Sequence, residues 1–459
     1  MTSDRRSCGA VQDTGGVADA IREAIGPQLD EPGSRFCVAL SGGLDSSVLL
    51  HALAALAPGR VRAVYVNHQL QPDAALWAEH CAQLCLQLGV PFAGLTVKVD
   101  PGHGHGPEAA ARQARYLALG AELRPGEVLV TAHHEGDQAE TVLLNLCRGS
   151  GPAGLAGIPA RGAVSGAVIL RPLLRLPKAA LFAYGRRAGF SWLEDPSNMD
   201  QRMDRNFLRH QVIPALGTRW PGAGAAIARS ARWSAEAAGL LEDLAALDAR
   251  RVLRKGRILV AALACLSEAR QRNLLRYLCR RELGSVPPEA RLREGLAQML
   301  SAGADRSPLL SWNGGEIRRY KGALYLMRHL ASRASSAQPV AVMPCRAGAR
   351  LDLGAAHGRI VLVRARGRGL ALSRLGSSLE IAFRSGGERL QPQGAGTVRE
   401  LKKLLQERAV VPWMRSRIPL LYSRGTLVAV ADLWLAREAA ATDGESALRV
   451  RWEDHPPAF

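Results

Sequence analysis

Short apolar segments alternate with helical segments through the first half of the chain, and this alternation constrains the fold more than any other feature. The strand-like runs are 36–40, 61–68, 91–99 and 127–133, and the helical patterns are 76–89, 106–123 and 136–149. Such alternation is typical of an α/β fold with a parallel sheet and helices on both faces. Ligands of these sheets bind at the carboxyl ends of the strands.

The rest of the chain has a different pattern. Helical patterns predominate from about residue 225, a strand-rich segment follows at 316–328, and 331–340 is small and polar, as expected of a linker. Short strands and one basic helix at 398–409 come after it. We therefore predict an N-terminal α/β domain at 1–222, a mainly helical domain at 223–332 and a small α+β domain at 333–459.

The charge of the chain indicates a class of partner. The sequence has 60 Lys and Arg against 41 Asp and Glu, a net charge of +19. Fifty-four of the basic residues are Arg. Genome base composition can explain the preference for Arg over Lys but not the imbalance of sign. A large positive surplus attracts phosphate polymers, so nucleic acid is the leading partner class.

Cysteine spacing and hydropathy indicate the compartment. None of the eight Cys forms a C-x-x-C pair, and Cys81 and Cys85 lie one helical turn apart, as buried free thiols would. No apolar stretch is long enough to span a bilayer, and the first residues have no signal-peptide core. We expect a cytosolic protein with no membrane partner. His103 and His105 are interpreted as loop residues rather than metal ligands.

A serine- and glycine-rich turn lies between the first strand-like run and the helix after it. It comprises Ser41, Gly42, Gly43, Leu44, Asp45 and Ser46. Glycines allow backbone N–H groups to turn inward, and a helix N-terminus adds unpaired donors and partial positive charge. We predict a pyrophosphate cradle; the alternative is a serine-capped helix start. It is not a Walker A loop, because no Gly-Lys-Ser/Thr follows.

This turn resembles the pyrophosphate loop of the N-type ATP pyrophosphatases. Further segments resemble the tRNA(Ile)-lysidine synthase family within that group. They are HHEGDQAET at 133–141, RGSG at 148–151, GLAG at 154–157, EAAARQARY at 108–116, EDPSN at 194–198 and DRNFLR at 204–209. The resemblance covers nearly the whole chain and is to the longer, three-domain form of the family.

The resemblance implies a reaction. ATP adenylates the C2 oxygen of the wobble cytidine of an isoleucine tRNA with a CAU anticodon, and the amine of free L-lysine then displaces AMP. The product, lysidine, changes codon reading from AUG to AUA. The resemblance implies ATP and Mg²⁺ as cofactors, and tRNA(Ile) and L-lysine as partners; a homodimer is a further expectation. The alternatives are a tRNA thiolase, which commonly carries C-x-x-C pairs, and a tRNA-binding protein that has lost catalysis.

Three carboxylates are the predicted catalytic groups: Asp45, Asp137 and Glu140. Asp137 follows a strand end and begins a helix, where it can bind Mg²⁺ with Asp45 or accept a proton from the lysine ammonium. Glu140 lies three residues later and shares the helix face with Asp137. The alternative is an acidic pair that complements the helix dipole. Family members often have a second acid at position 136, where this chain has Gly136.

Basic residues predicted to contact tRNA or phosphate occur in three places: Arg112 and Arg115, Arg205 and Arg209, and Lys402, Lys403 and Arg408. The first pair lies on one helix face, and the second follows EDPSN, where ATP phosphates or the anticodon stem are the predicted ligands. The third set belongs to residues 384–424, which contain nine basic and three acidic residues. Solvated helix charges are the alternative in each place.

Overall fold

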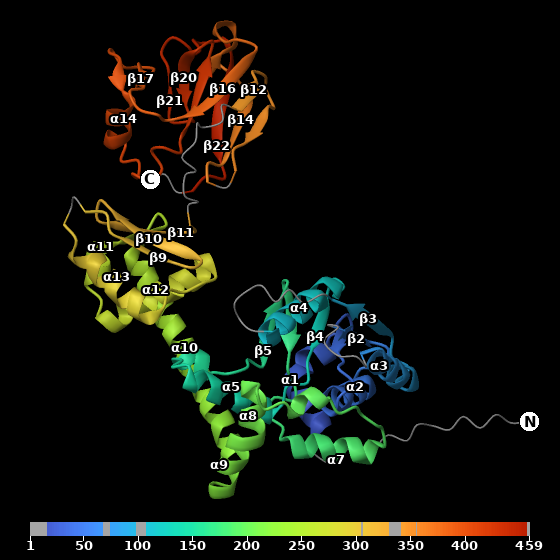
Figure 1. The fold of residues 1–459 in the computed structure, drawn as a ribbon. Coiled ribbons are helices and arrows are strands. Elements are labelled where there is room, and N and C mark those ends of the chain that lie inside the picture. Colours follow the sequence, from blue (N-terminus) through green and yellow to red (C-terminus); the bar gives the residue numbers. More distant parts are fainter. Residues whose placement is uncertain are drawn as a thin grey trace, which may run out of the picture. The chain divides into compact units, whose positions relative to one another are not determined.

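The computed structural model describes residues 16–67, 74–97, 107–303, 306–329, 341–354 and 356–456 (Figure 1). The chain divides into two compact units, Met1–Leu241 and Glu242–Phe459, which are described separately. His103, His105 and the predicted linker at 331–340 lie outside the described residues, and the predicted division into three domains remains a prediction. None of the helices within the described ranges is long and apolar enough to cross a membrane.

The first unit contains a six-stranded sheet of order β3-β2-β1-β4-β6-β5. The strands are β1 (Arg35–Ala39), β2 (Val61–Asn67), β3 (Phe92–Thr96), β4 (Glu127–Val130), β5 (Arg161–Val164) and β6 (Ala167–Leu170). Neighbouring strands are parallel except for β5 and β6. The predicted parallel sheet is confirmed, and the strand order reverses between β1 and β4.

Helices cover both faces of this sheet (Figure 1). They include α1 (Val17–Asp30), α2 (Leu44–Leu56), α3 (Ala74–Leu88), α4 (Pro107–Glu122), α5 (Glu135–Cys147) and α7 (Lys178–Ala188). Phe36 and Val38 of β1 pack in one core with α1, α2, α3 and α7. Cys37 packs on the opposite face with Leu119 of α4. Because both faces are covered, the strands are continuous apolar runs rather than alternating ones.

The hairpin of β5 and β6 was not predicted from the sequence. Ser165 and Gly166 connect the two strands, and their φ angles are +47° and +84°. Two consecutive left-handed residues form the connection that matches the twist of a two-stranded ribbon. Leu129 and Val130 of β4 pair with the last two residues of β6, so the carboxyl ends of both strands lie at one edge.

The first unit also contains short helical segments. These are α6 (Pro152–Leu155), η1 (Pro196–Met199), α8 (Asp204–Phe207), a π-helical turn η2 (Leu208–Val212) and α9 (Ile213–Arg219). The helix α10 (Ala223–Val252) continues from the first unit into the second. Single π-helical turns are rare and frequently occur at functional sites, and η2 contains Arg209.

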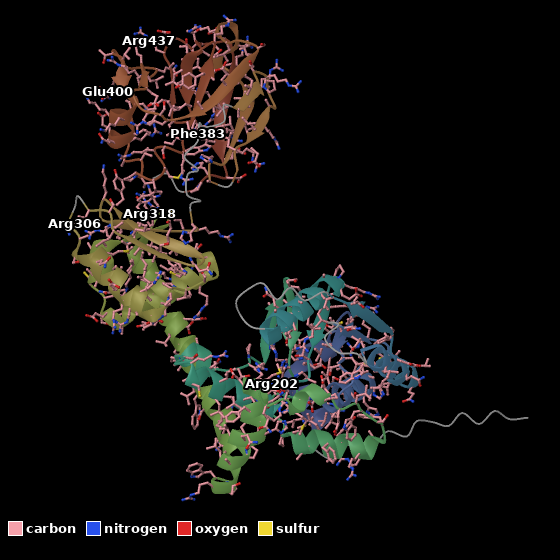
Figure 2. The ribbon with its side chains drawn as sticks, in the orientation of Figure 1. Arg202, Arg306, Arg318, Phe383, Glu400 and Arg437 are labelled. Carbon is pink, nitrogen blue, oxygen red and sulfur yellow. The ribbon has the colours of Figure 1, made fainter. Side chains whose placement is uncertain are left out.

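The second unit begins with the end of α10, three helices and a five-stranded sheet of order β7-β8-β11-β10-β9. The elements are β7 (Leu253–Arg254), β8 (Arg257–Leu259), α11 (Val260–Ala264), α12 (Glu268–Leu283), α13 (Glu289–Ser301), β9 (Leu309–Trp312), β10 (Gly315–Tyr320) and β11 (Ala323–Met327). Arg318 of β10, labelled in Figure 2, has its guanidinium 5.4 Å from the centre of the Trp413 ring. The predicted mainly helical region with a strand-rich end is confirmed.

The remainder of the second unit is rich in strands. Two sheets have the orders β12-β16-β19-β20-β21 and β13-β14-β22-β15, and β17 pairs with β18. The elements are β12 (Ala341–Pro344), β13 (Arg350–Asp352), β14 (Arg359–Arg366), β15 (Leu370–Ala371), η3 (Leu372–Arg374), β16 (Ser378–Phe383), β17 (Arg389–Leu390), β18 (Arg399–Glu400), α14 (Leu401–Glu407), β19 (Pro419–Ser423), β20 (Thr426–Val430), β21 (Trp434–Leu435) and β22 (Ser446–Glu453). The predicted basic helix at 398–409 is shorter, because Arg399 and Glu400 pair with β17 as a strand.

Candidate active site

The serine- and glycine-rich turn connects β1 to α2 and lies at the carboxyl edge of the sheet. Gly42 has a φ of +81°, and a Cβ there would lie 3.1 Å from Cys81 Sγ. Only glycine adopts this backbone without strain. Ser46 Oγ closes the turn, since it accepts from the Ser41 N–H at 3.1 Å and donates to the Gly43 carbonyl at 3.1 Å.

The N-terminus of α2 has no side-chain cap on its N–H groups. Gly43 is the N-cap residue and carries no side chain that could accept from them. The first N–H groups of a helix have no intrahelical partner, and together with the helix dipole they attract an anion. The alternative of a serine-capped helix start is therefore wrong, and the phosphate cradle remains a prediction.

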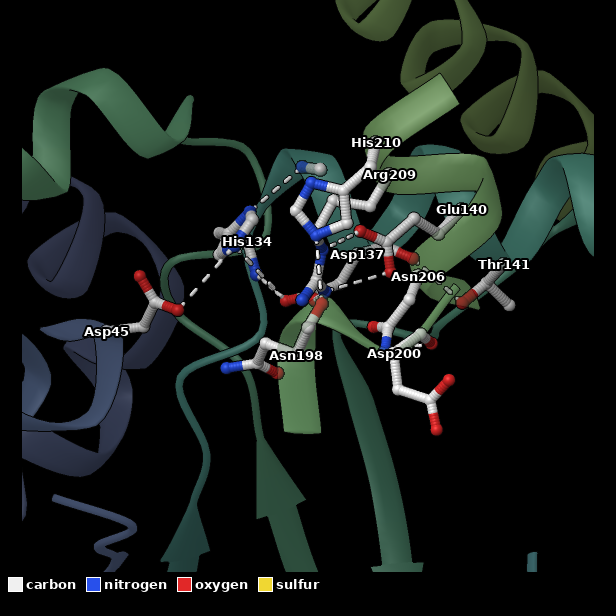
Figure 3. A network of polar contacts seen from close by, with 11 residues as sticks. Asp45, His134, Asp137, Glu140, Thr141, Asn198, Asp200, Asn206, Arg209 and His210 are labelled. Carbon is white, nitrogen blue, oxygen red and sulfur yellow. Dashed lines mark hydrogen bonds and ion pairs between the residues drawn. The ribbon is translucent and has the colours of Figure 1, made fainter. Parts of the chain in front are cut away.

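Asp45 and Asp137 lie on either side of one buried imidazole (Figure 3). His134 Nε2 is 3.6 Å from Asp45 Oδ2 and 3.7 Å from Asp137 Oδ2. His134 is also the N-cap of α5, and its backbone N–H donates to Asp137 Oδ2 at 2.9 Å. The two predicted carboxylates, which are 92 positions apart in the sequence, thus meet at the point where the strand order reverses.

The surroundings shift the pKa values of these two carboxyl groups in opposite directions. Burial raises the pKa of Asp45, and the nearby Asp137 charge adds to that rise, while His134 and Lys178 oppose it. Burial also acts to raise the pKa of Asp137, but His134, through its imidazole and its backbone N–H, and Arg209 lower it below its usual value. Asp137 is therefore ionised throughout the neutral range.

Glu140 is bound by one arginine. Arg209 donates from Nε to Glu140 Oε1 at 2.6 Å and from Nη2 to Oε2 at 3.0 Å, and Nη2 lies 3.4 Å from Asp137 Oδ1. Burial raises the pKa of Glu140, and the Arg209 guanidinium opposes that rise. In this arrangement Arg209 faces carboxylates, so its predicted contact with ATP phosphates or the anticodon stem remains a prediction, as does a catalytic role for Glu140.

Several positive charges gather beside the carboxylates. Burial lowers the pKa of the Arg112 guanidinium, and nearby like charges lower it further; these belong to Arg205, Arg115 and Arg171. Burial, with three of these arginines, lowers the pKa of His133 to about 3. His133 is therefore neutral at pH 7. A concentration of guanidinium groups at the carboxyl edge of a sheet creates the potential that an anionic substrate requires.

The other motif residues hold the site together. Gln138 accepts from the Ile158 N–H at 2.6 Å and donates to the Ile158 carbonyl at 3.2 Å, which ties α5 to the segment after α6. Asn145 donates to the Gly154 carbonyl at 2.8 Å. Gln138 of DQAET also donates to the Ala156 carbonyl of GLAG at 3.3 Å, so a hydrogen bond joins the two motifs.

Models of known families match three parts of the chain. A PP-loop domain matches residues 17–216, a TilS substrate binding domain matches 259–325, and a TilS substrate C-terminal domain matches 379–452. The tRNA(Ile)-lysidine synthase of Alkalilimnicola ehrlichii is 44% identical over 93% of this chain and 95% of its own length. The chain belongs to the tRNA(Ile)-lysidine synthase family. The synthase of Coxiella burnetii is 38% identical over 86% of this chain and 88% of its own.

A solved structure gives a more distant likeness. The solved U34-tRNA thiolase NcsA of Methanococcus maripaludis, with its [4Fe-4S] cluster, aligns with a TM-score of 0.41 at 16% identity. It covers 48% of this chain and 78% of the thiolase chain. The two relatives named above, at 44% and 38% identity, are lysidine synthases, so membership of that family stands and the thiolase alternative is not adopted.

Three residues of this family member at the site were not predicted from sequence: His134 as the group between two carboxylates, Arg171 and Lys178. Arg171 follows β6, is buried, and donates to the Pro159 carbonyl at 2.7 Å. Lys178 is the first residue of α7, and its positive charge acts to lower the pKa of Asp45. A lysine in the first turn of a helix opposes the helix dipole, and that conflict is the signal that could have identified it.

The predicted basic residues of the second unit are exposed. Lys402 and Lys403 lie on α14, and Lys403 Nζ is 3.8 Å from Glu400. Arg408 donates to the Leu433 carbonyl at 3.1 Å, with its guanidinium 5.1 Å from the centre of the Trp434 ring. Arg408 is therefore held in place more firmly than the two lysines, and the role of all three in tRNA contact remains a prediction.

The chemistry of the donor groups at the first-unit site fits Mg²⁺. Asp45 Oδ1 is buried and has no hydrogen-bond partner among the described residues. A carboxylate oxygen is the ligand that Mg²⁺ prefers, and Mg²⁺ usually takes one or two protein carboxylates with substrate phosphates and water. Within the described ranges no group of three or more His, Cys, Asp and Glu could hold a metal.

Asp45 gives a prediction on stability. Its pKa is raised in the folded state, so it stabilises the fold below the ordinary carboxyl pKa, and this stability is lost as the pH rises through the raised value. Asp45→Asn should therefore raise the Tm at about pH 8, and the gain should shrink toward about pH 5. Thermal unfolding of both proteins across this range measures the effect; a gain that grows toward acid pH would contradict it.

Proposed function

We propose that this protein ligates L-lysine to C2 of the wobble cytidine of an isoleucine tRNA with a CAU anticodon. In the first step the C2 oxygen attacks the α-phosphorus of ATP, and pyrophosphate leaves. In the second step the lysine amine attacks C2, the C2–O bond breaks, and AMP leaves. The amine gives up protons as the new carbon–nitrogen bond forms. The product lysidine changes the codon read from AUG to AUA.

The observation that carries this proposal is the meeting of the phosphate cradle with Asp45, His134 and Asp137 at one point of the sheet edge. A reaction between ATP and tRNA brings two polyanions together, which requires nearby positive charge. The uncapped N-terminus of α2 suits the departing pyrophosphate. Arg112, Arg115, Arg171 and Arg205 lie near enough to influence one another and suit further phosphate groups.

The carboxylates suit two tasks. Asp45 and Asp137 would hold Mg²⁺, which supplies charge neutralisation at the phosphates when bound. As a general base Asp137 would accept a proton from the lysine ammonium, but its lowered pKa makes it a weak base. The lowered pKa keeps Asp137 negatively charged and therefore favours cation binding as its principal task.

A reaction with defined omissions tests the proposal. The full-length protein is incubated with ATP, Mg²⁺, radiolabelled L-lysine and an unmodified isoleucine tRNA transcript, and lysine in tRNA and released pyrophosphate are both measured. Lysine incorporation should require all four components and should stop when the wobble cytidine is replaced by uridine. Incorporation of sulfur instead, or pyrophosphate release independent of tRNA, would refute it.

Three properties of the protein as a whole remain predictions. The cytosolic location, expected from the sequence, is testable by fractionation, and the homodimer is testable by sedimentation. L-lysine as the amine donor is tested by the reaction described above, with other amino acids as competitors.

The basic residues of the second unit give a prediction on salt dependence. Each phosphate contact by Lys or Arg contributes roughly 0.7–0.9 to the slope of log affinity against log salt. Replacing Lys402, Lys403 and Arg408 by Gln should therefore flatten this slope by about two units and raise the KM for tRNA. The KM values for ATP and lysine serve as the internal control and should not change. An unchanged slope would mean that these residues are merely solvated.

A further inference from the structure

The two ring nitrogens of His134 have different partners (Figure 3). Nδ1 accepts from the Gly136 N–H at 2.9 Å, so Nδ1 carries a lone pair and the ring proton is on Nε2. That Nε2–H faces Asp45 Oδ2 and Asp137 Oδ2 at nearly equal distances of 3.6 and 3.7 Å. His134 is only 4% exposed, so its ring lies buried beside both carboxylates.

Gly136 leaves the space that the ring occupies. A Cβ at position 136 would lie 2.7 Å from His134 Cε1 and 3.0 Å from Nδ1, closer than Cβ atoms approach their neighbours. A side chain at position 136 would therefore require the His134 ring to shift. Gly136 leaves room for the ring in the position that it has in this chain.

We propose that His134 is a positioning residue: it fixes the orientations of Asp45 and Asp137, and Gly136 leaves room for its ring. The inference rests on the proposed function, in which the two carboxylates act together. With their Oδ2 atoms directed at His134, the carboxylates present their other oxygens to the site. Asp45 Oδ1 is the buried atom without a partner among the described residues, and Asp137 Oδ1 is the atom near Arg209.

The helix cap alone does not account for this geometry. Capping uses Nδ1 and the backbone N–H of His134, which donates to Asp137. An asparagine or serine would cap α5 as well. The Nε2 side of the ring contributes nothing to the cap, yet it lies between the two carboxylates.

Two substitutions separate the cap from the positioning role. Asn places its side-chain oxygen where Nδ1 is and has no atom that reaches the carboxylates, whereas Gln places its amide nitrogen near Nε2 and loses the cap. His134→Asn should keep the wild-type Tm and lower kcat by about 10–100-fold. His134→Gln should lower the Tm by about 2–4 °C and still turn over about tenfold faster than the Asn variant.

Gly136→Ala tests the space beside the ring. It should lower kcat to a similar extent. The double variant Gly136→Ala with His134→Asn should have a kcat only slightly below that of His134→Asn alone, because both substitutions disrupt the same interaction. Likewise His134→Asn should have little further effect in an Asp137→Asn background. Fully additive losses in these double variants would overturn the proposal.

One measurement does not depend on turnover. Nitrogen-15 NMR of histidine-labelled protein, with the His134 signal identified by its absence in His134→Asn, should show the Nε2–H tautomer. An Nδ1–H tautomer would overturn the proposal even if the protein makes lysidine. If kcat falls in proportion to Tm in both the Asn and the Gln variants, His134 acts only as the N-cap of α5, and the proposal is wrong. Failure of the wild type to make lysidine would refute the proposed function and leave the tautomer result standing.

Discussion

Asp137→Asn should reduce lysidine formation by about 10²–10⁴-fold, the range expected when a positioned acid–base group or an electrostatic partner is lost. Asn keeps the shape of the side chain and can still accept from the His134 backbone N–H, so α5 should remain folded. The variant removes the negative charge beside His134 and Arg209. Urea unfolding should confirm that the loss is chemical rather than structural.

Two ways of restoring the rate distinguish the roles of Asp137. A general base works best when its pKa lies near the operating pH, and the surroundings lower the pKa of Asp137 instead. We therefore expect added Mg²⁺ to recover part of the rate and alkaline pH to recover little. Asp19→Asn, an exposed substitution in the same unit, is the matched control. Recovery at alkaline pH alone would contradict cation binding and favour the base role.

Site residues could be predicted from the sequence where they are close together in the chain. The turn at 41–46 and the start of α5 at Asp137 were predicted because strand, turn and helix follow each other directly in the chain. The edge of a parallel sheet then brought these segments together without further information. Gly136, in contrast, indicates only a missing carboxylate in the sequence; its role as space for His134 depends on three-dimensional packing.

Contacts between distant segments could not be predicted in this way. Arg209 and Glu140 are 69 positions apart, and each had an interpretation of its own as a phosphate contact and a catalytic acid. Arg171 reaches the site through β6, whose hairpin was missed. The basic helix α14 was predicted too long because local composition favours a helix, while pairing of Arg399 and Glu400 with β17 overrides it.

Arg209→Met should destabilise the first unit by about 3–5 kcal/mol, because it leaves the carboxylate of Glu140 buried without its cation. The Glu140 side chain is 2% exposed, so water cannot replace the lost hydrogen bonds. Without Arg209 the pKa of Glu140 should rise further, so stability is lost as the pH rises through it. The destabilisation should therefore be larger at about pH 8 than at about pH 5.

The double variant Arg209→Met with Glu140→Leu gives the decisive comparison. Replacing a whole buried pair by apolar side chains is often neutral, so most of the stability should return. Urea unfolding of the full chain, with hydrogen exchange of the α5 amides to assign the first unit, measures both variants. If the double variant is stable but inactive, the pair has a chemical task beyond its structural one. A fully stable Arg209→Met variant would contradict the structural role of the ion pair. It would favour the predicted catalytic role of Glu140 instead.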